Sequence, residues 1–320
     1  MSLSPEQVDG YLDRISLPPL VRTWLRQGPN GPDALKAIIK LQQCHLAAIP
    51  FENLDLVYSS HHSIKTQTDL VYEHIVKRRR GGVCDSVHPL FARLLRFYGF
   101  PVYLTGSRIN AAAGIVADPK LDKSKPNYGP WVHLNTIVTI GGERYIVDTG
   151  HGPSGSPWPV RLAHDEPVVD IWPRKRRMIY DSIPGWSDPG QKWWRMQLRH
   201  TDADPWMDVW AFTETEWLEV DFQMLRNAYA ALGTGWVTPR PVCFRTLFEE
   251  GIPVGYLLLA ESELRRNYKG ETMVIQKFFN ENDRVTALAA EFGIYLTDEE
   301  QKQIAGYAAE LRDEDFDYYA

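Results

Sequence analysis

The sequence is poor in cysteine: its 320 residues contain only Cys44, Cys84 and Cys243, far apart and without a C-x-x-C pair. An odd number of isolated thiols argues against a disulfide framework and against a cysteine-based structural zinc site. The nine histidines also lack H-E-x-x-H or comparable spacing, so we expect no metal. In a reducing compartment such thiols stay available for chemistry.

Long apolar runs and an excess of basic residues are missing as well. No apolar stretch approaches the roughly 18 residues that span a bilayer, and the first residues lack the pattern of a secretory leader. We therefore expect a cytoplasmic protein without membrane contact. The formal net charge of -6 argues against a nucleic-acid-binding protein. The basic cluster at 174–177 is interpreted as a solvated loop in preference to an RNA or single-stranded DNA contact.

Local patterns change along the chain, which is long enough for two or three cores. Helix-capping sequences and helical spacing of apolar residues dominate the first hundred residues, whereas short β-branched and aromatic runs follow Pro101. A first helix is expected to begin at Ser4, and further helices are expected at 33–46, 68–78, 217–231 and 297–312. The expected strands are 102–109, 131–140, 145–147 and 254–259. Residues 153–200 are expected to be irregular.

Cys84 closes the segment 80–84 (RGGVC), behind the helix expected at 68–78 and ahead of an amphipathic stretch that begins near Leu90. This position predicts a thiol at a helix N-terminus, where backbone N–H groups and the helix dipole favour the thiolate. The alternative is an ordinary buried cysteine, since free cysteine is among the most buried residue types.

A Gly-Gly pair at 141–142 predicts a two-residue turn between two strands. Counting back from the turn places Ile140 opposite Glu143 and makes Asp148 a diagonal neighbour of His133 on the same face. A carboxylate in that position holds one imidazole nitrogen. The alternative is a turn aspartate and a surface histidine.

Cys84, His133 and Asp148 together have the composition of an activated nucleophile, in which a third group orients the base. Hairpin geometry does not show that Cys84 approaches His133. Four segments that include these residues resemble the signature segments of the arylamine N-acetyltransferases. They are 45–54 (HLAAIPFENL), 80–84 (RGGVC), 132–134 (VHL) and 146–152 (IVDTGHG), and a weaker likeness extends from 221 to 243.

The resemblance implies an α+β multi-domain fold with a cysteine-protease-like catalytic core. Residues 1–99 would form a helical bundle with the nucleophile. Residues 100–214 would form a β-barrel with the histidine, the aspartate and an inserted irregular loop, and residues 215–320 an α/β lid.

The resemblance also implies acyl transfer by a ping-pong mechanism. Cys84 would take an acyl group from acyl-coenzyme A (acyl-CoA), and an aromatic amine or hydrazine would then accept it. His133 would act as base and acid, Asp148 would orient it, and backbone N–H groups near Cys84 would stabilise the oxyanion. The partners are therefore two small molecules, and no obligate protein partner is expected.

Further site residues follow from the matched segments. His151 stands where the family has Phe or a small residue in the acceptor pocket, and we expect it to bind the acceptor together with Val83. Gly106, Tyr229 and Thr234 fall near positions that contact coenzyme A in relatives.

The chain departs from the family pattern at Ser86 and His88, where relatives often have Glu or Gln and then Asn. We interpret His88 as a polar structural replacement. The acyl group is expected to be acetyl, with malonyl or propionyl as alternatives. An anionic malonyl group would need a cationic or strongly hydrogen-bonding partner, for which Arg108 and His88 are candidates.

Three other functions use the same residues or the same fold. A cysteine hydrolase or transglutaminase-like enzyme would act on amides without coenzyme A. An amide synthase would close a large product on the same scaffold. A non-catalytic binding protein would keep the fold and lose the reaction.

Overall fold

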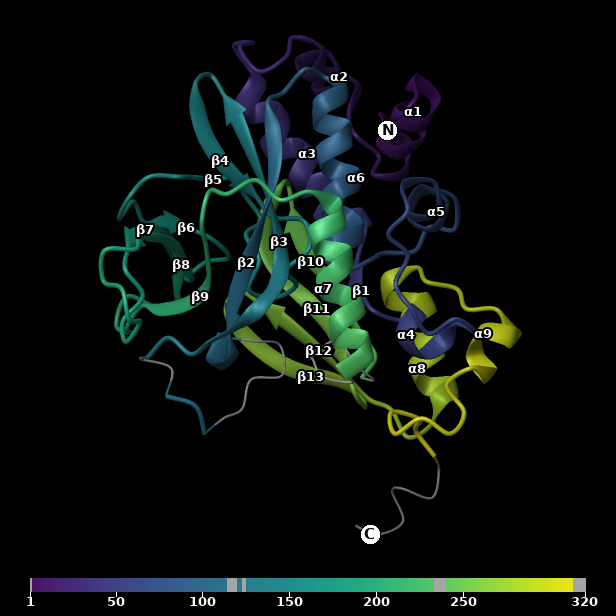
Figure 1. The fold of residues 1–320 in the computed structure, drawn as a ribbon. Coiled ribbons are helices and arrows are strands. Elements are labelled where there is room, and N and C mark those ends of the chain that lie inside the picture. The colour runs from purple at the N-terminus through teal and green to yellow at the C-terminus, as the bar shows by residue number, and fades with distance from the viewer. Residues whose placement is uncertain (1, 114–119, 123–124, 233–239, 313–320) are drawn as a thin grey trace.

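The computed structural model describes residues 2–113, 120–122, 125–232 and 240–312, and for 229–232 it describes the backbone only. In Figure 1 the N-terminal helices lie at the top, beside one end of the larger sheet, and the strands of the smaller sheet lie in the lower half of the view. Within the described residues, no helix is both long and apolar enough to cross a membrane.

The N-terminal helices pack around one apolar core, which includes Leu12, Leu41 and Phe91. Ser4 caps the first helix in a capping box, as predicted. The elements of this region are α1 (Pro5–Arg14), α2 (Pro19–Arg26), α3 (Ala34–Ala48), β1 (Phe51–Glu52), α4 (Asp55–Tyr58), α5 (Thr68–Tyr72), the π-helical turn Glu73–Lys77 and α6 (Cys84–Phe97).

The larger sheet is antiparallel, and its eight strands follow the order β5-β4-β3-β2-β9-β8-β7-β6. A short 3-10 helix, Ala111–Ala113, directly follows β2 in the chain. The strands are β2 (Val102–Asn110), β3 (Tyr128–Ile140), β4 (Glu143–Val147), β5 (Val160–Arg161), β6 (Val168–Val169), β7 (Lys175–Asp181), β8 (Trp193–Arg199) and β9 (Met207–Phe212).

The predicted hairpin is confirmed. Ile140 pairs with Glu143 and Thr136 with Val147, so the register places Asp148 one residue beyond the last ladder pair. Gly141 and Gly142 have φ of 58° and 86°, the left-handed values that a tight hairpin turn requires at both positions.

The expectation that 153–200 is irregular is wrong, because β5 to β8 lie there. Strand β8 is buried on both faces and so lacks the alternation that marks a strand in sequence. The solvated-loop interpretation of 174–177 is also wrong. Arg174 and Arg176 are buried and both pair with Asp170. Lys175 and Arg177 pair with Asp202 and Asp165.

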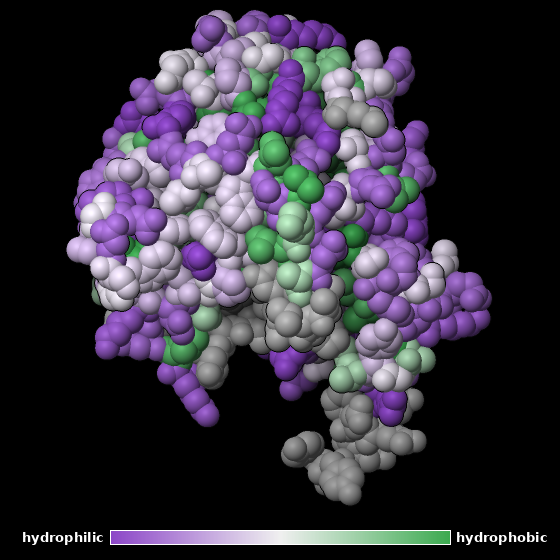
Figure 2. Space-filling view, viewed as in Figure 1, coloured by the Kyte–Doolittle hydropathy of each residue, from purple (hydrophilic) through white to green (hydrophobic). Residues whose placement is uncertain are grey.

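The smaller sheet joins the segment after α3 to the C-terminal part of the chain, because β1 pairs with β10 and the order is β1-β10-β11-β12-β13. Exposed Leu218, Val220 and Met224 lie on or beside α7, over which Figure 2 shows apolar side chains. The elements of this part are α7 (Glu219–Leu232), β10 (Val242–Glu249), β11 (Ile252–Ala260), β12 (Glu263–Tyr268), β13 (Glu271–Lys277), α8 (Glu281–Phe292) and α9 (Asp298–Lys302).

The last helix is shorter than predicted. The capping box of Thr297 and Glu300 is present, but α9 ends at Lys302 and does not continue to 312. Gly306 has φ of 84° in the turns that follow, a left-handed backbone that an α-helix does not contain. Residues 303–309 therefore form turns and a bend, and 310–312 have no regular structure.

Candidate active site

Cys84 is the first residue of α6, so the predicted position at a helix N-terminus is confirmed. The preceding loop passes very close to the segment around β1. A Cβ atom on Gly81 would lie 1.9 Å from the carbonyl oxygen of Pro50, so only glycine fits there. The amide N–H of Gly82 donates to the same oxygen at 3.2 Å, and Glu52 N–H donates to Gly82 O at 3.2 Å.

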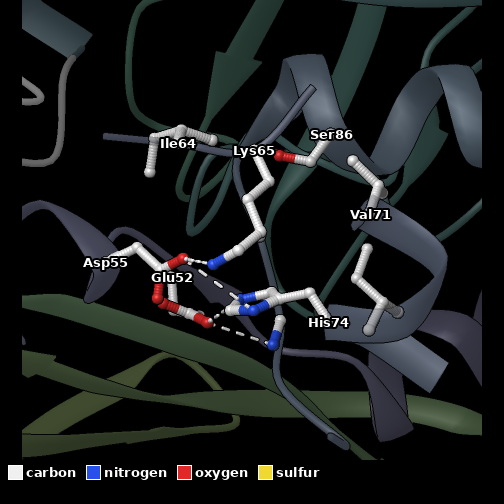
Figure 3. A pocket seen from close by; sticks show the side chains of 10 residues that line it. Glu52, Asp55, Ile64, Lys65, Val71, His74 and Ser86 are labelled. Carbon is white, nitrogen blue, oxygen red and sulfur yellow. Dashed lines mark hydrogen bonds and ion pairs between the residues drawn. The ribbon is translucent and has the colours of Figure 1, made fainter. Parts of the chain in front are cut away.

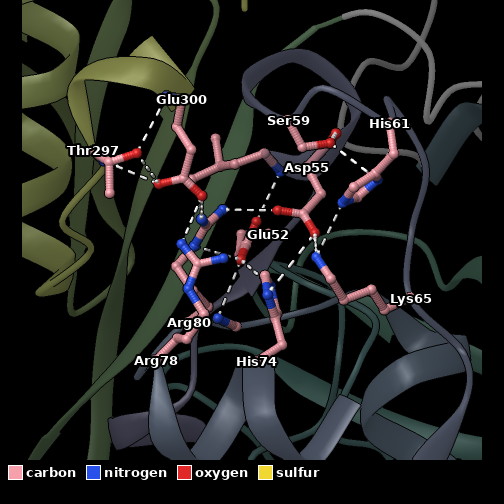
Figure 4. Close-up of polar contacts among 12 residues, drawn as sticks. Glu52, Asp55, Ser59, His61, Lys65, His74, Arg78, Arg80, Thr297 and Glu300 are labelled. Carbon is pink, nitrogen blue, oxygen red and sulfur yellow. Dashed lines mark hydrogen bonds and ion pairs between the residues drawn. The ribbon is translucent and has the colours of Figure 1, made fainter. Parts of the chain in front are cut away.

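A buried ionic cluster lies beside this loop and bonds to it. The Arg80 side chain is 1% exposed, and its guanidinium lies 3.3 Å from Glu52, 3.4 Å from Asp55 and 3.6 Å from Glu300 (Figure 4). Glu52 also accepts a hydrogen bond from the Gly81 N–H at 3.1 Å. Three distant segments therefore meet at Arg80, the residue that leads into the loop before Cys84.

A small cavity of about 10 Å³ adjoins the cluster and the loop, with Lys65, His74 and Ser86 among its lining residues (Figure 3). Buried His74 Nδ1 and Ser86 Oγ have no hydrogen-bond partner among the described residues. The volume suits about one water molecule, which would satisfy such groups. It is far too small for a substrate site.

Asp148 lies between two imidazoles. Its Oδ2 is 3.5 Å from His133 Nε2 and its Oδ1 is 3.2 Å from His88 Nε2. Oδ1 also accepts a hydrogen bond from the Gly150 N–H at 3.0 Å. Burial opposes the charge, but His133 and His88 outweigh it and hold the pKa of Asp148 well below its usual range. Asp148 is therefore a carboxylate at neutral pH.

Cys84 meets this pair through the turn that follows Asp148. A Cβ atom on Gly150 would lie 2.7 Å from the Cα of Cys84, so the glycine lets the two backbones touch. Among the described residues, the Cys84 thiol is hydrogen bonded, at 3.9 Å, to the carbonyl oxygen of Val132, the neighbour of His133. The tertiary structure thus gathers the three residues that the sequence singled out.

The backbone at the helix N-terminus favours a Cys84 thiolate, as expected, but burial outweighs this effect. Burial raises the pKa of the Cys84 thiol to about 11, although Arg226 on α7 and backbone hydrogen bonding lower it. Desolvation penalises an isolated anion more than the helix terminus stabilises it. Cys84 is therefore neutral at rest, and ionisation needs a base that takes its proton.

His88 has both ring nitrogens engaged and is fully buried. Its Nδ1 lies 2.9 Å from Thr136 Oγ1, and its Nε2 bonds Asp148. Burial lowers the pKa of His88, with Asp148 acting in the opposite direction. The ring is therefore not available to a malonyl carboxylate.

His151 is buried beside the pair. Its ring centroid is 4.8 Å from that of His133 and 6.5 Å from that of Trp210. Neither nitrogen has a hydrogen-bond partner among the described residues. Burial lowers the pKa of His151 to about 3, so the ring is neutral. Val83 does not lie in this group and packs in a separate apolar cluster with Phe51.

Of the three residues predicted to contact coenzyme A, the structure describes all of Gly106 and the backbone of Tyr229. Gly106 lies in β2 directly under Trp217, whose ring would be 2.7 Å from an added Cβ. Tyr229 is in α7, with its side chain outside the described atoms, and Thr234 lies outside the described residues. Arg108 stacks on Trp131 and donates to the carbonyl oxygen of Gly129 at 3.0 Å.

Sequence reasoning missed one contact within this site, the sharing of Asp148 by two imidazoles. His88, His133 and Asp148 offer donor atoms that all lie within 4.8 Å of one another, a composition that also occurs in metal sites. The same atoms already form a hydrogen bond and an ion pair, which is the arrangement of a proton-transfer group.

Comparison with known proteins identifies the family. A family model described as N-acetyltransferase matches residues 34–301. The chain is 30% identical over 282 residues to the N-malonyltransferase FDB2 of Fusarium pseudograminearum, covering 85% of this chain and 81% of that protein.

Solved structures give the same result for the fold. The arylamine N-acetyltransferase from Mycobacterium abscessus has a TM-score of 0.74 at 21% identity, covering 93% of both chains. That from Mycobacterium marinum in complex with CoA has a TM-score of 0.71 at 21% identity, covering 93% of this chain and 98% of that one.

The fold is therefore that of an acyl-transferring enzyme built from helices and curled antiparallel sheets. The chain belongs to the arylamine N-acetyltransferase family and is an N-acyltransferase of that type. The resemblance predicted from four short segments is confirmed.

Proposed function

We propose that this protein is an acyl-CoA:arylamine N-acyltransferase in which Cys84 carries the acyl group as a thioester. One observation carries the proposal: the turn after Asp148 contacts the Cα position of Cys84, while Asp148 faces His133 at 3.5 Å. These contacts support the assignment of Cys84 as nucleophile, His133 as base and Asp148 as the carboxylate that orients the base.

In the first half-reaction, His133 takes the thiol proton of Cys84 as sulfur attacks the thioester carbonyl of acyl-CoA. Asp148 stabilises the imidazolium that forms, and the first backbone N–H groups of α6 face the developing oxyanion. The C–S bond to coenzyme A breaks, and His133 returns its proton to the departing thiolate. Cys84 is then acylated.

In the second half-reaction, an aromatic amine or hydrazine attacks the Cys84 thioester. His133 accepts a proton from the nitrogen and gives it to the Cys84 sulfur as that C–S bond breaks. The amide leaves and the thiol is restored, so atoms and charge balance over the cycle. His151 would line the acceptor side, because neither of its buried nitrogens has a hydrogen-bond partner in the described part of the chain and a substrate could supply one.

The same proposal covers the finer architecture. Residues 1–99, 100–214 and 215–320 would act as bundle, barrel and lid around a cysteine-protease-like core, in the cytoplasm. Gly106, Tyr229, Thr234 and Val83 remain predictions for substrate contact. The acyl group is acetyl, malonyl or propionyl; the name of the relative FDB2 supports including malonyl.

The test is the intact mass of the protein after mixing with acetyl-, malonyl- or propionyl-CoA. We expect a single acyl adduct with one donor, its loss on adding an aromatic amine, and no adduct on Cys84→Ala. Cys44→Ala is the matched control and should acylate normally, because Cys44 lies on α3 outside the site. Amide cleavage without coenzyme A, or no adduct with any donor, would overturn the proposal.

A further inference from the structure

Asp148 has its closer imidazole contact with a histidine outside the proposed triad. The distance from Oδ1 to His88 Nε2 is 3.2 Å, against 3.5 Å from Oδ2 to His133 Nε2. All three side chains are at most 2% exposed, and the two imidazole centroids are 5.6 Å apart. The carboxylate is therefore shared.

The hydrogen bonds of His88 define its tautomer. Asp148 is ionised and can only accept, so Nε2 of His88 must carry a hydrogen. Burial keeps the ring neutral, and Nδ1 is then an acceptor for the hydroxyl of Thr136 at 2.9 Å. Thr136, His88 and Asp148 thus form a chain in which every donor points toward the carboxylate.

This chain restricts the carboxylate. Oδ1 receives two donors, from His88 and from the Gly150 N–H at 3.0 Å, which leaves Oδ2 for His133. A second imidazolium next to His133 would be repelled, so a neutral His88 lets His133 be the one ring that gains charge. The titratable groups that face His88 are His133, Asp148 and His45.

We propose that His88 is a positioning residue for the transfer reaction: it locks Asp148 through Oδ1 so that Oδ2 orients His133 toward the thiol of Cys84. The inference rests on the proposed function of Cys84, His133 and Asp148. This role differs from the expectation that His88 is only a polar structural residue.

The test measures the rate of Cys84 alkylation by iodoacetamide against pH, together with acylation by the active acyl-CoA. His88→Leu removes both hydrogen bonds, whereas His88→Gln places an amide N–H near the position of Nε2. We expect His88→Leu to slow alkylation near neutral pH by about thirtyfold, about 2 kcal/mol at 1.4 kcal/mol per tenfold. His88→Gln should stay within about threefold of the native rate.

The pH profile separates positioning from a structural effect. Because burial raises the pKa of Cys84 to about 11, the thiol ionises near that pH without help from His133. The deficit of His88→Leu should therefore vanish as pH approaches 11. A steric or folding defect would slow alkylation at every pH.

His62→Leu is the matched control, since it deletes another hydrogen-bonded imidazole, one whose Nδ1 lies 3.1 Å from Leu56 O and whose ring packs on Tyr307, away from the site. It should lower stability and leave the pH profile unchanged. Equal neutral-pH rates for His88→Leu and the native protein, or equal losses for Leu and Gln, would overturn the inference. If the native protein forms no acyl adduct at all, it is the proposed function that fails.

Discussion

Arg80 offers the sharpest test of how the nucleophile loop is held. Its guanidinium is the cation at the centre of Glu52, Asp55 and Glu300, and its side chain is 1% exposed. Replacing Arg80 by Met keeps much of the volume and removes the charge. Two carboxylates, which are 1% and 5% exposed, then lose their nearest guanidinium.

We expect Arg80→Met to lower the free energy of unfolding by about 3–5 kcal/mol at pH 7, the cost of leaving buried charge without its partner. Arg78→Met is the matched control, because Arg78 binds the same Glu300 at 2.6 Å but is 39% exposed. An exposed pair of this kind contributes at most about 1 kcal/mol. Urea unfolding followed by fluorescence measures both.

The pH dependence has a definite sign. Burial would raise the pKa of Glu52, but Arg80, His74 and the backbone N–H of Leu54 together outweigh burial and lower that pKa below the ordinary value of 4.5. The stabilisation is thus complete above about pH 4.5 and lost as pH falls further. The gap between native and Arg80→Met should be widest at neutral pH and narrow below pH 4.5.

Arg80→Met should also slow Cys84 alkylation, because Glu52 holds the Gly81 N–H at the head of the loop. The double variant Arg80→Met/Glu52→Gln should recover part of the lost stability, since it removes one of the stranded charges. Equal losses for Arg80→Met and Arg78→Met, or a loss under 1 kcal/mol, would refute the reasoning.

Three further predictions concern the site. Gly150→Ala places a Cβ 2.7 Å from the Cα of Cys84, so it should lower the free energy of unfolding in urea by about 1–3 kcal/mol. Gly129→Ala is the control, because its nearest contact is at 3.8 Å, and it should lower that free energy by under about 0.5 kcal/mol. Similar values for both variants would contradict the close approach of Gly150 to Cys84. His133→Gln removes the proposed base, so Cys84 alkylation should fall about hundredfold at neutral pH and approach the native rate near pH 11; an unchanged rate at neutral pH would exclude His133 as the base. Asp148→Asn removes the charge that stabilises the imidazolium and should reduce single-turnover acylation at least about hundredfold, and an unchanged rate would remove Asp148 from the mechanism.

The hairpin shows how far local pattern reaches. The Gly-Gly turn and the register of Ile140 with Glu143 follow from two-residue turn geometry and a side-chain period of two. Placing Asp148 beside His133 needed nothing beyond that. The helix start at Cys84 was equally readable, because glycines and apolar periodicity mark it locally.

Elements without a local signature were not readable. Strands β7 and β8 were expected to be irregular, although they pair with each other and β8 with β9 in chain order, because β8 is buried on both faces and shows no alternation. The burial of Arg176 against Asp170 was hidden because a run of basic residues is ordinarily solvated. Strand β1, only two residues long, exists because β10 pairs with it.

The amino-acid sequence by itself determined the family, the start of a helix at Cys84 and the placement of Asp148 beside His133, because these lie in short segments whose geometry is set by near neighbours. Only the tertiary structure decided that the thiol is buried with a raised pKa, that His88 shares Asp148, and that Arg80 ties three segments together. Desolvation and the meeting of distant charges depend on what surrounds a group in space, and no local pattern in the chain encodes that.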